Sequence, residues 1–261
     1  MAGHSKWANI KRQKARVDAV KGQVFTKISR EIIVAARSGV PDPEGNFQLR
    51  TAIAKAKAAG IPNSNIDRAI AKGAGKLGAG EAALEAIRYE GYGPGGVAVL
   101  IEALTDNRNR TAADLRAAFS KNGGNLGETG CVGWMFEQKG VAIVSGDLPE
   151  DDLLEASVAA EAESYERFET EDAKGFPWVG YDVKGEVDQL EAMVQALQEH
   201  GLTVSQAELR WYPTNTLTVQ DPEQARSLLK MIDALEDLDD VQTVTANFEM
   251  DDEVMAAAIG S

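Results

Sequence analysis

The sequence predicts an α+β protein, with a basic three-helix domain at the amino terminus followed by two ferredoxin-like α+β domains, one inserted in the other. Three observations predict this class. Residues 24–73 carry apolar side chains at helical spacing, residues 134–211 alternate strands and helices in the order βαββαβ, and the segments on either side of 134–211 supply a second set of similar elements. We therefore expect three domains, at 1–78, at 79–133 together with 212–250, and at 134–211.

The first domain is expected to contain three helices. The first spans 24–37, the second spans 47–59, and the third begins at Asn63 or Ser64, which are both good N-cap residues, and ends at Gly73. Each helix ends where glycine or proline follows, because these residues interrupt helical hydrogen bonding or favour a helix terminus.

The glycine-rich stretch 73–80 matches the pattern G-x-G-x-x-G of nucleotide-binding loops. That loop must follow a strand and open a helix, whereas this stretch follows a helix. Leu77 also stands after Gly75 and Lys76, where a P-loop needs serine or threonine. We interpret 73–80 as a linker between domains.

The second domain is expected to begin with a buried strand at 97–104, which is an apolar run rich in β-branched residues behind the turn-rich stretch 89–96. Thr111 and Asp114 have the spacing of a capping box for the next helix. After the insertion the chain is expected to return with a strand at 214–219, a helix at 222–235 and a strand at 241–248. The insertion itself is expected to hold strands at 140–144, 165–170, 178–183 and 203–211, with helices at 149–162 and 187–200.

Charge is distributed very unevenly along the chain, whose net charge is −14. Residues 1–80 hold 15 basic and 5 acidic side chains, residues 81–145 hold 6 and 8, and residues 146–261 hold 6 and 28. A basic end on an acidic body suits a protein that meets nucleic acid in one orientation, because a phosphate surface repels the acidic part.

Residues 1–23, which we call the basic arm, precede the first predicted helix and are the strongest candidate for a nucleic-acid contact. Clustered lysine and arginine release counterions from nucleic acid, and a tryptophan can stack on a base. The arm has few large apolar residues, so we expect it to be mobile until bound. The alternative is that it folds back onto the acidic remainder of the chain. The candidate nucleic-acid-binding residues of the arm and first helix are Lys6, Trp7, Lys11, Arg12, Lys14, Arg16, Lys21, Lys27 and Arg30.

Arg108 and Arg110 form a second basic candidate, placed where a loop leads into a helix. Unpaired backbone N–H groups at a helix amino terminus favour anions, so these two side chains can clamp a phosphate. They can equally form structural ion pairs with Asp106, Asp114 or Glu102. The sequence leaves both readings open.

No arrangement of residues in the sequence calls for catalysis. His200 stands at a predicted helix end, Cys131 is the single cysteine and reads as a small buried hydrophobe, and the acidic clusters lack the spacing of a calcium loop. We expect no enzyme activity, cofactor, bound metal or small-molecule substrate. No stretch approaches the ~20 apolar residues of a membrane span, and we expect a cytoplasmic protein with no membrane partner.

Several stretches carry a family resemblance: 2–7, 21–27, 62–66, 89–96, 105–111 and 231–237. They resemble the YebC family, whose bacterial members are usually described as probable transcriptional regulators and whose mitochondrial relatives are described as translational activators. Cys131 stands where the family pattern has serine, which is close to it in size. The resemblance implies a three-domain protein without enzymatic activity that binds nucleic acid.

Two functions follow from the resemblance. One is a DNA-binding regulator of transcription. The other is a ribosome-associated translation factor that binds ribosomal RNA and assists translation of difficult, proline-rich sequences. A third reading is an acidic scaffold whose arm pairs internally. The partner is accordingly DNA, ribosomal RNA or both, with the ribosome as a further partner in the second case.

Overall fold

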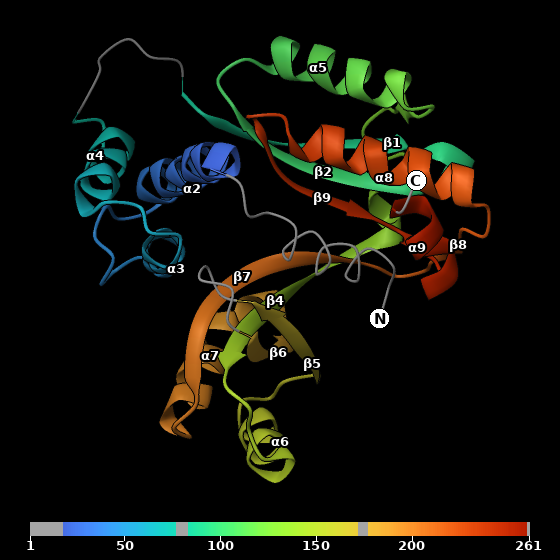
Figure 1. Ribbon diagram of the computed structural model, residues 1–261. Coiled ribbons are helices and arrows are strands. Elements are labelled where there is room, and N and C mark those ends of the chain that lie inside the picture. The colour runs from blue at the N-terminus through green and yellow to red at the C-terminus, as the bar shows by residue number, and fades with distance from the viewer. Residues whose placement is uncertain (1–17, 77–82, 172–176, 260–261) are drawn as a thin grey trace.

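The computed structural model describes residues 18–76, 83–171 and 177–259. It confirms the predicted α+β class, with helices first in the chain and antiparallel sheets after them (Figure 1). Most of the basic arm and part of the predicted linker at 73–80 lie outside the described residues.

The helical region, residues 18–76, contains the three predicted helices, but the first begins six residues earlier than predicted, so that residues 18–23 of the basic arm belong to it. It consists of α2 (Asp18–Ser38), α3 (Phe47–Ala58) and α4 (Asn63–Gly73). Ile32, Leu49 and Ala56 are fully buried in its core. Asn46 ties α3 to α2, because its side chain accepts from Leu49 N at 3.0 Å and donates to the Ala35 carbonyl at 2.8 Å.

The first sheet has the strand order β3-β1-β2-β9 and is antiparallel throughout. Its strands are β1 (Glu85–Tyr92), β2 (Ala98–Thr105), β3 (Asn125–Leu126) and β9 (Val241–Ala246). Helices α5 (Arg108–Lys121) and α8 (Pro222–Glu236) cover one face of it (Figure 1). Val99, Ile101, Phe119 and Leu228 form the centre of this core.

This first sheet departs from the second βαββαβ set that we expected. Strand β1 takes in residues 89–92, which we assigned to a turn-rich entry, and residues 85–88, to which we assigned no element. The strand expected at 214–219 is reduced to β8 (Leu217–Thr218), which leaves the main sheet and pairs in parallel with β10 (Phe248–Glu249). A last helix, α9 (Asp252–Ile259), packs on α8 and was not expected.

The capping box predicted for the helix after β2 is wrong. The N-cap of α5 is Asn107, whose side chain accepts from Arg110 N at 3.1 Å. Thr111 is instead buried, and its hydroxyl turns toward Asp240. The N-cap, and with it the start of the helix, therefore lies four residues earlier than the pattern of Thr111 and Asp114 indicated.

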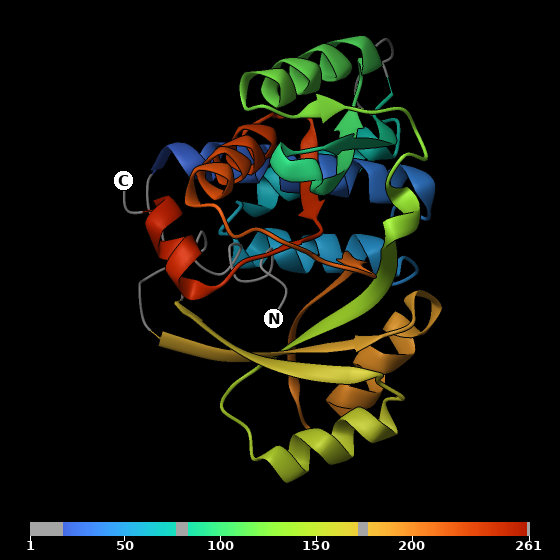
Figure 2. The same cartoon turned by 90° about the vertical axis from the view of Figure 1, so that its right-hand side faces the viewer.

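The second sheet has the predicted βαββαβ chain order, with strands arranged β5-β6-β4-β7 and antiparallel neighbours. Its elements are β4 (Phe136–Ser145), α6 (Glu150–Ala159), β5 (Ser164–Glu171), β6 (Pro177–Gly185), α7 (Leu190–Glu199) and β7 (Thr203–Pro213). The core between the helices and one face of the sheet includes Leu153, Met193 and Leu197. In both views α5 and α6 lie at opposite ends of the molecule (Figure 2).

The two sheets are separate, but side chains from both pack together where the chain passes between them. Phe136 at the start of β4 packs with Ala98, Leu100 and Val132, and Trp211 near the end of β7 joins the same cluster. Boundaries at 133 and 212 therefore fall inside packed side chains. We propose three domains, at 1–78, at 79–133 with 212–250, and at 134–211, because the helical region and each of the two sheets have a hydrophobic core of their own.

Candidate nucleic-acid interface

The structure describes the side chains of four of the eleven candidate residues. Lys6, Trp7, Lys11, Arg12, Lys14 and Arg16 lie outside the described residues, and Lys21 lies within α2 with its side chain outside the description. The four that remain are Lys27 and Arg30 on α2, and Arg108 and Arg110 in the first turns of α5.

Arg30 and Arg110 converge on one carboxylate, that of Asp240. Arg30 Nη1 donates to Asp240 Oδ1 at 2.6 Å, and Arg110 Nη2 donates to Oδ2 at 2.9 Å. The hydroxyls of Thr111 and Thr105 also donate to Oδ2, at 2.7 and 3.1 Å. Through these hydrogen bonds, the network ties α2, β2 and α5 to the α8–β9 turn. Asp240 is only 5% exposed, so the network is shielded from water.

The Asp240 carboxylate is held in its charged form. Burial raises its pKa, but hydrogen bonds from Thr111, Arg110, Arg30 and Thr105 outweigh burial and lower the pKa to about 2. The negative charge is therefore present at neutral pH, where it fixes both guanidinium groups.

Both arginines have further partners inside the protein. Arg30 donates to the carbonyls of Asp239 at 2.7 Å and Leu104 at 3.0 Å. Arg110 donates to Asp106 at 2.8 Å, one of the three acidic partners considered from the sequence. These contacts favour a structural role for Arg30 and Arg110.

Lys27 likewise contacts another part of the protein, the end of α8. Its Nζ lies 2.5 Å from the carbonyl of Glu236, and the neighbouring Gln23 donates to the carbonyl of Asp237 at 3.1 Å. The carbonyls at the end of α8 carry partial negative charge, which suits a lysine there. Together with Arg30, these side chains hold α2 against the α8–β9 turn.

Arg108 differs from the other three. Its side chain is 68% exposed, and its one ion pair with a described residue, to Glu85 at 3.5 Å, is exposed as well. An exposed pair of this kind contributes little to stability and is easily exchanged for a phosphate. Of the four described candidates, Arg108 is the one whose guanidinium is best placed for an outside anion.

The helical region carries further basic residues that the sequence analysis did not single out. Arg37, Lys57, Arg68 and Lys76 are exposed, and none of them forms an ion pair with another described residue. The signal was available in the 15 basic against 5 acidic residues of 1–80. We had confined the candidates to the arm, the first helix and the loop before α5.

The described residues contain no group of three or more histidine, cysteine and acidic side chains that could hold a metal ion. His200 lies at the end of α7 with Nδ1 2.9 Å from the Ala196 carbonyl, a helix-end contact. Cys131 is half-buried, and its pKa is raised by burial and by the nearby Glu90. Within the described ranges, no helix is both long and apolar enough to span a membrane.

These features define an α+β protein in which a basic helical region is tied, through the buried Asp240, to the first of two antiparallel sheets. The chain belongs to the TACO1/YebC family. Residues 5–76 match the model of the TACO1/YebC protein N-terminal domain, and residues 84–248 match that of the TACO1/YebC second and third domain.

Similar proteins span the whole chain. A probable transcriptional regulatory protein of Gloeothece citriformis is 69% identical over 259 residues, covering 99% of this chain and all of its own length. One of Synechocystis is 64% identical over 256 residues, covering 98% of this chain and 99% of its own length. The crystal structure of a conserved hypothetical protein from Aquifex aeolicus superimposes with a TM-score of 0.83 at 44% identity, covering 96% of this chain and 99% of the other.

Proposed function

We propose that this protein is a non-enzymatic regulator of gene expression that binds DNA through its basic arm and helical region. The observation that carries the proposal is the charge distribution, 15 basic against 5 acidic residues in 1–80 and 6 against 28 in 146–261. Such a distribution presents one end to phosphates and repels them from the other. The names of the relatives, probable transcriptional regulatory proteins, support the same function.

The described side chains refine which residues take part. Arg30, Arg110 and Lys27 are engaged within the protein, so we assign the phosphate contacts chiefly to the arm, to Arg108 and to the exposed Lys57 and Arg68. We propose that the protein acts in the cytoplasm without a cofactor, a metal, a membrane or a small-molecule substrate.

A second candidate is a ribosome-associated translation factor that binds ribosomal RNA. It is favoured by Trp7 within a basic arm, because single-stranded and irregular RNA offers unstacked bases for an aromatic side chain, whereas duplex DNA does not. The acidic sheets then face basic ribosomal proteins, and the factor assists translation of proline-rich sequences.

In-cell ultraviolet crosslinking of the tagged full-length protein, with recovered DNA and RNA sequenced in parallel, separates the two functions. The test variant is Lys11→Glu with Lys14→Glu. The matched control, with the same change in charge on α5 and α8, is Lys121→Glu with Lys230→Glu. Promoter peaks that vanish in the test variant alone support the DNA regulator. Ribosomal RNA peaks with the same dependence, and promoter DNA at background, support the translation factor.

Binding in solution gives a second test. If the arm contacts about six phosphates, the logarithm of affinity falls against the logarithm of salt concentration with a slope of about −4 to −5. The test variant should weaken binding to all sequences alike and flatten the slope, and the control should do neither. Crosslinks and affinities unchanged in the test variant would refute a role for the arm.

A further inference from the structure

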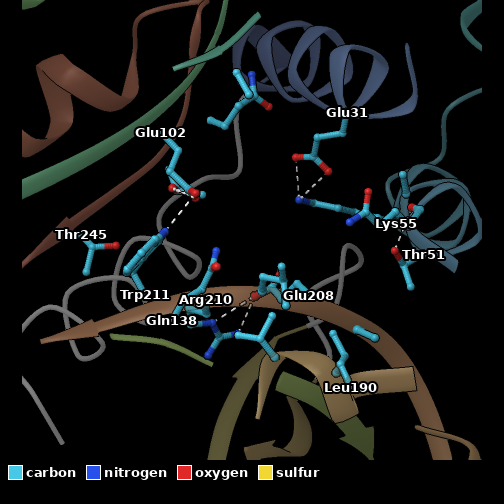
Figure 3. Close-up of a pocket in the computed structure, with 18 of the residues that line it drawn as sticks. Glu31, Thr51, Lys55, Glu102, Gln138, Leu190, Glu208, Arg210, Trp211 and Thr245 are labelled. Carbon is cyan, nitrogen blue, oxygen red and sulfur yellow. Dashed lines mark hydrogen bonds and ion pairs between the residues drawn. The ribbon is translucent and has the colours of Figure 1, made fainter. Parts of the chain in front are cut away.

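A cleft of about 1030 Å³ lies where the helical region meets the two sheets (Figure 3). Glu31 and Lys55 come from α2 and α3 on one side, Glu102 from β2 on another, and Arg210 and Trp211 from β7 along the floor. Segments far apart in the sequence thus build one cavity, on the sheet faces that α5, α6, α7 and α8 leave uncovered.

The wall of the cleft is strongly acidic. Eight carboxylate side chains line it against three basic ones, Lys55, Arg88 and Arg210. An opening with this excess of negative charge repels nucleic acid and attracts a cationic guest.

The three basic side chains are already engaged in the wall. Lys55 Nζ lies 2.9 Å from Glu31, Arg210 pairs with Glu208 at 2.6 Å and with Asp182, and the Arg88 guanidinium lies 5.1 Å from the centre of the Trp211 ring. Three of the acidic residues around the opening form no ion pair with the basic residues of the wall. Glu166 lies 3.6 Å from Lys184, Glu191 pairs with Arg50 on the surface, and Asp188 has no ion pair with a described residue.

The cleft also holds hydrogen-bonding groups without partners. Within the described ranges, the buried Nε2 and Oε1 of Gln242 have no hydrogen-bond partner, and neither has the buried Asp182 Oδ1. The Gln242 amide therefore needs one hydrogen-bond acceptor for its N–H and one donor for its oxygen. A polypeptide backbone offers one donor and one acceptor per residue. The guest indicated by these groups and by the charge is a basic polypeptide segment.

We propose that the cleft is the docking site of residues 1–17 of the same chain, and that nucleic acid competes with the cleft for this segment. Residues 1–17 contain five basic and no acidic side chains. They lead directly into α2, whose Lys27 contacts Glu236, a residue of the cleft wall. Seventeen residues reach up to about 60 Å when extended.

Docking would keep the segment from phosphates until nucleic acid displaces it. The docking itself rests on the cleft, whereas the competition rests on the proposed nucleic-acid binding. The apparent affinity for nucleic acid is then reduced by the fraction of molecules whose segment is docked.

The test measures distance within the full-length protein. In a Cys131→Ser background, spin labels are placed at Ala8→Cys and at Val187→Cys, a 37% exposed residue lining the cleft. Docking gives a short, narrow distance distribution at low salt, which broadens when duplex DNA or ribosomal RNA is added. Molecules labelled singly at each site and mixed should give no short distance.

Two variants with equal changes in charge make the test specific. The cleft variant is Glu166→Gln, Asp188→Asn and Glu191→Gln. The control, on the outer helix α6, is Glu150→Gln, Asp151→Asn and Asp152→Asn. Only the cleft variant should broaden the distances, and it should bind nucleic acid at least about threefold more tightly than the control.

Other outcomes overturn the proposal in distinct ways. A broad distribution in the unaltered protein, or equal effects of the two variants, excludes docking in the cleft. A short distance between singly labelled molecules assigns the cleft to the segment of a second copy. Charge-dependent binding of a lysine-rich peptide without a short internal distance assigns the cleft to a separate basic partner. Distances that respond to the cleft variant while neither nucleic acid binds would leave docking standing and refute the proposed function and the competition.

Discussion

Replacing Asp240 with asparagine should strongly weaken the attachment of α2 to the first sheet. The substitution keeps the size of the side chain and removes the charge that accepts from Arg30, Arg110, Thr105 and Thr111. The site is only 5% exposed, so water cannot replace the lost contacts.

The expected loss can be worked out in two ways. Breaking a buried ion pair by removing one partner costs about 3–5 kcal/mol, and the lower end applies because both arginines keep other acceptors. The fall of the Asp240 pKa from 3.8 to about 2 corresponds to about 2.5 kcal/mol, which solvent screening at the half-exposed Arg110 reduces to about 1–2 kcal/mol. We therefore expect Asp240→Asn to lower the free energy of unfolding by about 2–3 kcal/mol.

Urea unfolding followed by circular dichroism at neutral pH measures this loss. The control is Asp239→Asn, because Asp239 is exposed and makes its contact to Arg30 through its backbone carbonyl. A difference between the two variants below about 0.5 kcal/mol, the range of ordinary surface substitutions, would refute the reasoning.

The same carboxylate gives a pH dependence of known sign. Its pKa is lower in the folded protein than in the unfolded chain, so its contribution is full above about pH 4 and is lost as pH falls toward about 2. Asp240→Asn should lack this loss, and Asp239→Asn should keep it. Equal slopes for the two variants between about pH 4 and pH 2 would contradict the assignment.

Three more predictions concern single side chains. Glu90→Gln should lower stability by about 2–3 kcal/mol in urea unfolding, because its buried carboxylate accepts from three backbone N–H groups at 2.7–2.9 Å; an unchanged midpoint would contradict this. Gly91→Ala should cost about 1–3 kcal/mol, since a Cβ there would lie 2.7 Å from both the Asn125 carbonyl oxygen and the Phe119 ring, and a neutral result would mean that the β3 backbone and the ring both move freely. Arg110→Ala should lower the melting temperature and leave the nucleic-acid affinity of the folded protein unchanged, whereas Arg108→Ala should do the reverse; the opposite pattern would reverse their roles.

The elements that the sequence predicts best are those whose pattern is local. Helix α3 has its N-cap, Asn46, and its terminal glycine, Gly60, within the span of the helix signals. The inserted sheet follows from the alternation of strand and helix periods along 134–211, and its βαββαβ order allows few arrangements of the strands.

Strand β1 could not be predicted as easily because its burial is decided by distant parts of the chain. Glu90 and Gly91 look like turn residues, yet both are buried in the strand. Glu90 is accommodated because the loop at 130–133 supplies backbone N–H groups to its carboxylate, and Gly91 because Phe119 lies against it. Neither partner is visible in the strand's own pattern.

The candidate nucleic-acid interface could also be predicted only in part. Charge counts located the basic end of the molecule, but they did not distinguish an arginine that faces solvent from one that faces a buried carboxylate. Asp240 lies 210 residues from Arg30 and 130 from Arg110, within the acidic run at 236–240. Only the fold brings these three residues together.

The internal use of Arg30, Arg110 and Lys27 sharpens the proposed function. Cations that hold α2 on the α8–β9 turn cannot turn to a phosphate without breaking contacts at 2.5–2.9 Å. Binding must then depend on the arm and on exposed residues such as Arg108 and Arg68, whose redirection costs little. Substitutions at Arg30, Arg110 and Lys27 should therefore change the stability of the protein. Substitutions in the arm and at the exposed arginines should instead change the affinity for nucleic acid and its salt dependence.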